Sequence, residues 1–204
     1  MKVAVLGGTG AFGSALARRL VEAGLDVTIG SRDPTRAAAT AAEVGAQGRA
    51  NAVAAADADF VVLAVDASAA LATATELADA IGATPVLSVA SELRFANGVA
   101  SPTDELLSLA ERTQQVLQGP VVAGLHSLAA AELTDAKAEG DALVCGDADD
   151  AKATALELAA HLVTGRALDA GPLASARALE AMTAVIVNLN RRYRGRAGLQ
   201  FVGL

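Results

Sequence analysis

Three glycines near the N-terminus have the spacing G-x-G-x-x-G, which is typical of a backbone turn that holds phosphate. Gly8, Gly10 and Gly13 follow the apolar run 2–6 and open a segment with helical periodicity over 11–23. In that context the first glycine permits a tight turn, the second lets the backbone approach a pyrophosphate, and the third lets helix and strand pack closely. The N–H groups and the dipole of the helix then face the phosphates.

The glycine turn therefore predicts a dinucleotide site, and a turn that only reverses the chain is the alternative. The residues between the glycines belong to the same predicted contacts. Thr9 could donate its hydroxyl to a phosphate or hydrogen-bond within the turn, and Ala11 and Phe12 begin the helix. We place Ala64 and Val65, at the end of the third expected strand, in the same cofactor site.

The residues after the second expected strand distinguish NADP from NAD. An NAD site usually has an acidic residue here for the ribose 2′-hydroxyl, but this chain has Ser31 and Arg32. Ser31 supplies a hydroxyl, Arg32 supplies a planar guanidinium suited to a 2′-phosphate, and Arg36 lies one helical turn further on. These residues favour NADP. The alternative is that both arginines are solvated residues at a helix start, with Asp33 as an ordinary N-cap.

Apolar runs alternate with helical segments along the whole chain. We expect strands at 2–6, 26–30, 60–65, 85–89, 120–125, 142–145 and 166–169, and helices at 11–23, 34–43, 68–81, 104–117, 149–162 and 173–193. Apolar strands that are separated by helices indicate a parallel sheet covered on both faces, which is a doubly wound α/β (Rossmann) fold. We expect a Rossmann domain over 1–149 and a small C-terminal lobe over 150–204 that ends in the long helix.

The composition narrows the classes of partner and the location. Hydrophobic residues make up 53% of the chain but aromatic residues only 2%, so Ala, Val and Leu must fill the interior. A net charge of -7 argues against binding to nucleic acid or a membrane surface, because both are polyanions. With a single cysteine, Cys145, and no signal sequence or long apolar run, we expect a cytoplasmic protein. Cys145 is expected in the core and His161 on the surface, which gives no metal site.

The sequence resembles the coenzyme F-420-dependent NADP oxidoreductases over nearly its whole length. The first two matching segments are shared with other Rossmann proteins, whereas the C-terminal stretch is much more specific. The segments are MKVAVLGGTG at 1–10, IGSRDP at 29–34, VVAGLH at 121–126, LVCGD at 143–147, and AGPL, ARALE and NLNRRY within 170–193.

This resemblance implies reversible hydride transfer between C4 of the nicotinamide of NADP(H) and C5 of a 5-deazaflavin, usually in a homodimer. It implies that the nucleotide site includes Thr9, Ser31, Arg32 and Arg36. It also implies that coenzyme F-420, as second substrate, binds at the end of the strand 120–125 and in the loop that follows.

His126 is the catalytic candidate in that second site, and Ser127 and Leu128 are the expected neighbouring contacts. Hydride delivery to C5 moves electron density toward the pyrimidine end of the deazaflavin, so fixed hydrogen-bond donors there help more than a general base. We expect His126 to orient the ring, with Ser127 or backbone N–H groups as donors. The alternative is a loop histidine whose hydrogen bonds are satisfied by the backbone.

Two loops depart from the family pattern. Asp66 and Ala67 stand where the family often has Pro-Trp, and the sequence ASEL at 90–93 replaces an Asn-Pro-Leu stretch. Because both loops lie near the expected meeting place of the rings, two other functions stay open. One is an NADPH-dependent reductase of a flavin, a ferric chelate or a small carbonyl compound, and the other is a non-catalytic module that senses NADP(H).

The last expected helix has an apolar face that is larger than a small lobe readily covers. This face includes Ile186, Val187 and Leu189. A self-complementary apolar surface of this kind favours a homodimer.

Overall fold

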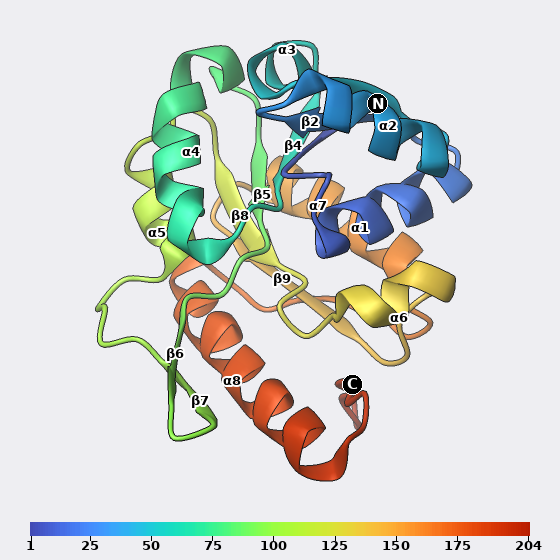
Figure 1. Cartoon of the computed structure of the whole chain (residues 1–204). Coiled ribbons are helices and arrows are strands. Elements are labelled where there is room, and N and C mark those ends of the chain that lie inside the picture. The colour runs from blue at the N-terminus through green and yellow to red at the C-terminus, as the bar shows by residue number, and fades with distance from the viewer.

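The computed structural model describes residues 1–204 and shows one central sheet between two layers of helices (Figure 1). The sheet has eight strands in the order β10-β9-β8-β5-β4-β1-β2-β3. In chain order these strands are β1 (Lys2–Leu6), β2 (Asp26–Ser31), β3 (Gln47–Ala50), β4 (Phe60–Leu63), β5 (Val86–Ser88), β8 (Val121–Gly124), β9 (Ala142–Gly146) and β10 (Ala167–Asp169). A separate hairpin consists of β6 (Leu93–Ala96) and β7 (Val99–Pro102).

The helices divide evenly between the two faces of the sheet. One face is covered by α1 (Ala11–Glu22), α2 (Pro34–Val44), α6 (Ala130–Asp135) and α7 (Asp149–Leu162). The other is covered by α3 (Asn51–Ala56), α4 (Ala67–Ile81), α5 (Leu109–Gln114) and α8 (Ala176–Tyr193), which a short 3-10 turn, η1 (Leu173–Ser175), precedes. None of these helices combines the length and apolar character that a membrane crossing requires.

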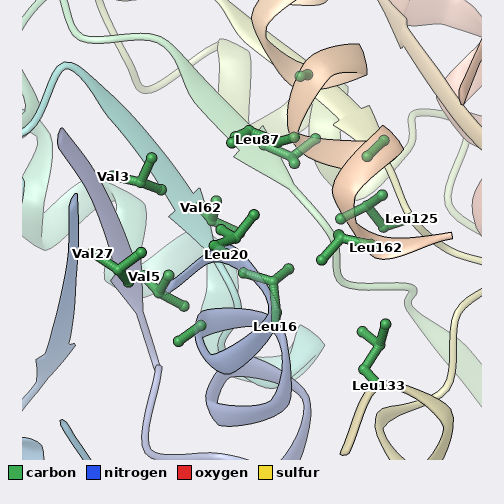
Figure 2. Close-up of a cluster of buried hydrophobic side chains, with 14 of the residues drawn as sticks. Val3, Val5, Leu16, Leu20, Val27, Val62, Leu87, Leu125, Leu133 and Leu162 are labelled. Carbon is green, nitrogen blue, oxygen red and sulfur yellow. The ribbon is translucent and has the colours of Figure 1, made fainter. Parts of the chain in front are cut away.

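Two apolar cores hold the layers together, one on each side of the sheet. Successive residues of a strand point to opposite faces, and in β1 both sets are apolar. Val3 and Val5 join the core under α1, whereas Ala4 and Leu6 join the core under α3 and α4. Figure 2 shows the first core, where Leu16 of α1 packs toward the sheet. The strands lack an alternation of apolar and polar residues because both faces of the sheet are covered by helices, as the sequence predicted.

The sheet is mostly parallel, as the doubly wound pattern predicts, but its β9–β10 edge runs the other way. β9 pairs with β8 in antiparallel register, with Val122 opposite Gly146 and Gly124 opposite Val144. The connection between them carries α6, which packs against α1. The chain therefore re-enters the sheet from the end at which β8 leaves it.

Several elements differ from the sequence-based expectations. The strand β3, the helix α3 and the hairpin β6–β7 were not predicted, and the helix expected over 104–117 extends only from Leu109 to Gln114. Its start is fixed by Ser108, whose Oγ accepts a hydrogen bond from the Glu111 N–H at 3.0 Å. The buried carboxylate of Glu180 on α8 also accepts from the N–H groups of the first two helical residues. Residues 104–108 therefore remain outside the helix.

The long helix α8 is tied to the hairpin as well as to the sheet. The side-chain amide of Asn188 donates to the Ala100 carbonyl and accepts from the Ala100 N–H, both at 2.8 Å. Ile186 is only 8% exposed, so the expectation that it belongs to a free apolar face is wrong. Packing within the chain covers this residue, while Leu189 stays 41% exposed.

The C-terminal tail is held by one buried carboxylate. Asp141, which is 2% exposed, accepts hydrogen bonds from the Arg166 N–H at 2.8 Å, from Arg166 Nη2 at 2.9 Å and from the Phe201 N–H at 2.8 Å. Arg166 Nη1 in turn donates to the Leu204 carbonyl at 2.9 Å. The Arg166 guanidinium and these N–H groups hold the pKa of Asp141 well below its usual range.

We predict that Asp141→Asn lowers stability at neutral pH and lowers it by less in acid. Because the pKa in the folded state lies below the unfolded value of about 3.9, the stabilisation is present above that pH and is lost as the pH falls. Thermal unfolding followed by circular dichroism should show a larger difference in Tm between wild type and variant at pH 7 than at pH 3. An equal difference at the two pH values would contradict a role for the charge.

Candidate functional site

The candidate site lies where the strand order reverses. β1 pairs with β2 on one side and with β4 on the other, both in parallel, so the carboxyl ends of these strands open a crevice. A cleft of about 210 Å³ lies there. Its lining residues are Gly7, Thr9, Gly10, Ser31, Arg32, Arg36, Asn51, Ala64, Val65, Asp66, Ala69 and Thr73.

The glycine turn has no room for side chains at its closest approaches. A Cβ on Gly13 would lie 2.7 Å from the Gly7 carbonyl oxygen, and a Cβ on Gly7 would lie 2.7 Å from that of Ala64. A Cβ on Gly8 would lie 2.8 Å from the Val5 carbonyl oxygen, whereas one on Gly10 would meet nothing closer than 3.4 Å. The residue of the turn with a left-handed backbone is Gly7, with φ +80°, which directly precedes the first glycine of the motif.

The start of α1 is open to an anion. Its N-cap, Gly10, offers no side chain to the first N–H groups, and the first turn contains no acidic residue. Ser14 is the first residue whose N–H bonds back along the helix, to the Gly10 carbonyl at 2.9 Å. The preceding N–H groups, including those of Ala11 and Phe12, are the unpaired donors of a helix start. With the helix dipole they form a cradle suited to a pyrophosphate.

The other end of the cleft is cationic. Asp33 accepts from the N–H groups of Thr35 at 2.9 Å and Arg36 at 3.3 Å, which confirms it as the N-cap of α2. Ser31 is 8% exposed, and its Oγ accepts from the Asp33 N–H at 3.2 Å. Arg36 Nη2 reaches across to the Thr9 carbonyl at 3.5 Å. Neither Arg32 nor Arg36 has a carboxylate partner, so two exposed guanidinium groups remain for an anionic ligand.

A second cleft, of about 360 Å³, adjoins the first and is mostly apolar. The two share Gly10, Ala64, Val65 and Asp66. The remaining walls of the second cleft are Ala11, Phe12, Ala67, Val89, Ala90, Ser91 and Ala130. Most of these side chains are small or apolar, which suits an uncharged ring more than a phosphate.

His126 lies at the carboxyl end of β8 but does not line either cleft. It is 8% exposed, its carbonyl accepts from Thr183 Oγ1 at 2.9 Å, and neither ring nitrogen has a hydrogen-bond partner. Burial lowers the pKa of His126 to about 4, and the backbone of Ala90, which favours the protonated ring, offsets only part of that shift. The ring is therefore neutral near pH 7.

The two residues after His126 are also enclosed. Ser127 is 7% exposed and its Oγ has no partner, while Leu128 packs against the core on the α1 side of the sheet. Leu125, with φ +66°, turns the chain out of β8 and into this loop. Within this segment it is Ala130 that reaches the apolar cleft. Cys145 is fully buried in the other core, as expected.

The structure thus gathers most of the predicted nucleotide residues in one place. Thr9, Gly10, Ser31, Arg32, Arg36, Ala64 and Val65 line the first cleft, Ala11 and Phe12 line the second, and Gly8 and Gly13 lie buried beneath the turn. The sequence reasoning missed Gly7, Asn51, Ala69 and Thr73. The doubled glycine was a usable signal for Gly7, whereas Asn51 gave none because β3 and α3 were not recognised.

Comparisons with known proteins identify the family of the chain. Residues 2–92 match a family model described as "NADP oxidoreductase coenzyme F420-dependent". The F420-dependent NADP reductase of Methanothermobacter marburgensis is 34% identical, over 100% of this chain and 99% of that protein. The chain belongs to this family. The F420-dependent NADP reductase of Methanocaldococcus jannaschii is 33% identical over equally complete lengths.

Solved structures support the same assignment. A crystal structure from Arthrobacter sp. FB24, named as a candidate F420-dependent NADP reductase, superposes with a TM-score of 0.87 over 100% of both chains at 27% identity. An imine reductase from Streptomyces aurantiacus has a TM-score of 0.63 at 20% identity, over 95% of this chain and 62% of that one, and shows the fold alone. The chain is an NADP-dependent oxidoreductase related to the F420-dependent NADP reductases.

We predict that two glycine substitutions in the turn affect different properties, one the stability of the protein and the other its affinity for NADP. Gly13→Ala places a methyl group against the rigid Gly7 backbone and should lower Tm by several degrees, in line with an overpacking cost of about 1 to 3 kcal/mol. Gly10→Ala has space in the free protein but crowds the pyrophosphate, so it should keep its Tm and lose NADP affinity. Thermal unfolding and calorimetric titration separate the two effects, and a stable Gly13→Ala protein would contradict the packing argument.

We also predict that His126 does not titrate near neutral pH. Because its pKa is lowered from 6.5 to about 4, the unfolded state binds a proton that the native state refuses, and stability declines as the pH falls from about 6.5 toward 4. The imidazole signals of His126 in NMR spectra should stay constant from pH 5.5 to 8. The variant His161→Gln removes the signals of the other histidine and so assigns those of His126. A midpoint near 6.5 for His126 would show that water reaches the ring.

Proposed function

We propose that the protein transfers a hydride reversibly between NADP(H) and coenzyme F-420. The observation that carries this proposal is the pair of adjoining clefts, one polar and cationic at its far end and one apolar. A dinucleotide needs two such neighbouring clefts, a cationic one for its phosphorylated adenosine half and an apolar one for its flat redox ring. The full-length similarity to F420-dependent NADP reductases supports the choice of second substrate.

The nucleotide half of the proposal rests on residues that form one continuous track. Ser31, Arg32 and Arg36 hold the 2′-phosphate, and the open N–H groups of α1 hold the pyrophosphate. Gly10, which lines both clefts, lets the nucleotide pass from one cleft to the other. The ring end of the cofactor then enters the apolar cleft.

The reaction centre lies in the apolar cleft. When bound there, NADPH supplies a hydride from C4 of its nicotinamide to C5 of the deazaflavin. Val65, Val89 and Phe12 line this cleft, so they would exclude water and limit the positions that the two rings can take. The protein supplies orientation and electrostatics, and no covalent step on a side chain is needed.

We further propose that the loop of His126, Ser127 and Leu128 orients the deazaflavin. His126 and Ser127 carry buried polar atoms without partners, next to the Ala90 loop that lines the apolar cleft. Such atoms are costly unless a ligand satisfies them. A neutral imidazole has one N–H donor, which would turn from the nearby Ala90 backbone to the pyrimidine carbonyls where negative charge develops.

The direct test mixes purified protein with NADPH and oxidised F-420 and follows the deazaflavin absorbance band. Rapid bleaching with NADPH, and much slower bleaching with NADH, is the expected result. Oxidation of NADPH only by a flavin, a ferric chelate or a small carbonyl compound would assign another acceptor. Tight NADPH binding with no oxidation by any acceptor would indicate a sensing module.

We predict that Arg32→Ala weakens NADP binding by roughly ten- to a hundredfold, because a charge-assisted hydrogen bond contributes about 1.5 to 3 kcal/mol. NAD affinity should barely change, since NAD has no 2′-phosphate. Calorimetric titration with NADP and with NAD measures the affinity of each protein for the two nucleotides. Arg18→Ala, on the adjacent helix but outside the cleft, is the matched control. Equal weakening of NADP and NAD would rule out a 2′-phosphate contact.

A homodimer is the assembly that we propose, with residues 150–204 supplying much of its interface and contributing to the deazaflavin site. Exposed apolar side chains gather on α8 and on the hairpin that α8 holds. They are Phe95, Val99, Val185, Leu189 and Tyr193. Arg191 packs over the Phe95 ring at 4.9 Å and donates to the Gly98 carbonyl, which joins the two parts into one surface. A closed two-fold contact would cover it.

We predict that Leu189→Asp shifts the protein from dimer to monomer without unfolding it. The carboxylate would be desolvated in the interface but remain in water in the monomer. Light scattering coupled to gel filtration gives the mass. The control is Leu106→Asp, because Leu106 lies on a loop and is 92% exposed. A wild-type protein that is monomeric at micromolar concentration would refute the proposed interface.

A further inference from the structure

Asn51 is a buried polar residue in the nucleotide cleft that the motifs did not identify. It lies at the junction of β3 and α3, is 9% exposed, and lines the first cleft together with Ser31 and Arg32. A Cβ on Gly30 would lie 2.8 Å from Asn51 Oδ1. The side chain therefore occupies the space that glycine leaves free at the end of β2.

The amide of Asn51 is not explained by the fold. Oδ1 is enclosed without a hydrogen-bond partner, and no side-chain hydrogen bond holds the amide in place. A buried amide without partners is destabilising, and an apolar side chain of similar size would fill the same space without that cost. No hydrogen bond within the chain fixes this amide, so a ligand that enters the cleft can pair with it, although Oδ1 itself lies enclosed beside Gly30.

The surroundings indicate which part of a nucleotide reaches this residue. Ser31, Arg32 and Arg36 supply the charge for a phosphate, whereas α4 contributes the neutral side chains of Ala69 and Thr73. Its acidic N-cap, Asp66, lies on the part of the cleft that is shared with the second cleft. Between the cations and the neutral side chains of α4 the cleft suits an uncharged planar group with a hydrogen-bonding edge. An asparagine amide, with one acceptor beside one donor, matches the amine and ring nitrogen of adenine.

We propose that Asn51 binds the adenine base of NADP(H). On binding, the amide rotates so that Oδ1, which is enclosed beside Gly30 in the free protein, accepts from the exocyclic amine while Nδ2 donates to the adjacent ring nitrogen. This inference rests on the NADP half of the proposed function and is independent of the acceptor. Ser31, Arg32 and Arg36 then select the 2′-phosphate, and Asn51 selects the base. Gly30 makes this possible, because any side chain there would displace the amide.

Calorimetric titration with 2′,5′-ADP, NADP and the hypoxanthine analogue of NADP tests the proposal without turnover. Asn51→Leu should weaken 2′,5′-ADP and NADP by about tenfold, as expected for the loss of hydrogen bonds to one base. Wild type should bind the hypoxanthine analogue more weakly than NADP, because a carbonyl replaces the amine. That preference should disappear in the variant.

A second variant guards against an effect on folding. Asn51→Thr keeps a polar side chain of similar size but lacks the amide edge and adds no charge, so it should lose adenine affinity while its Tm stays near that of wild type. If Asn51→Leu weakened NADP and the hypoxanthine analogue equally, the residue would contact ribose or phosphate and the proposal would be overturned. Unchanged affinity for 2′,5′-ADP in both variants would overturn it too. Tight binding of 2′,5′-ADP without bleaching of F-420 would refute only the proposed acceptor.

Discussion

The close approach of the glycine turn to the strands beneath it is the constraint on which the rest of the site depends. Gly13 lies against the Gly7 backbone, and Gly7 lies against the carbonyl of Ala64 at the end of β4. These contacts fix the start of α1 over the gap between β1 and β4, so the unpaired N–H groups of the helix face the crevice. A side chain in either place would move the helix away and remove the anion site.

The other side of the site depends on α8. Glu180 accepts from the first N–H groups of α5, Thr183 donates to the His126 carbonyl, and Asn188 pairs with the backbone of β7. A single helix therefore positions the proposed deazaflavin loop and the hairpin of the proposed interface. The two proposals are coupled through this helix, because a change in the contact between copies would act on the element that holds His126.

The sequence predicted the features that depend on local chemistry. The glycine spacing, the Ser31-Arg32 pair and the apolar strands each follow from contacts within a few residues, and the first two line one cleft. The topology was harder, since the antiparallel β9 depends on how α6 packs against α1. The hairpin β6–β7 depends on a partner, Asn188, that is 88 positions away. The burial of His126 and the position of Asn51 in the first cleft likewise depend on tertiary packing. The division into two domains near residue 149 remains a prediction.

Transfer of deuterium is the measurement that tests the central claim most directly. NADPH labelled at C4 of the nicotinamide, on one face and then on the other, is mixed with protein and oxidised F-420, and the reduced coenzyme is analysed by mass spectrometry. If the two rings meet in the apolar cleft, one of the labelled forms transfers its deuterium to C5 of the deazaflavin without dilution by solvent. Reduced coenzyme that carries only solvent hydrogen with both forms, or no reduction at all, would contradict the account.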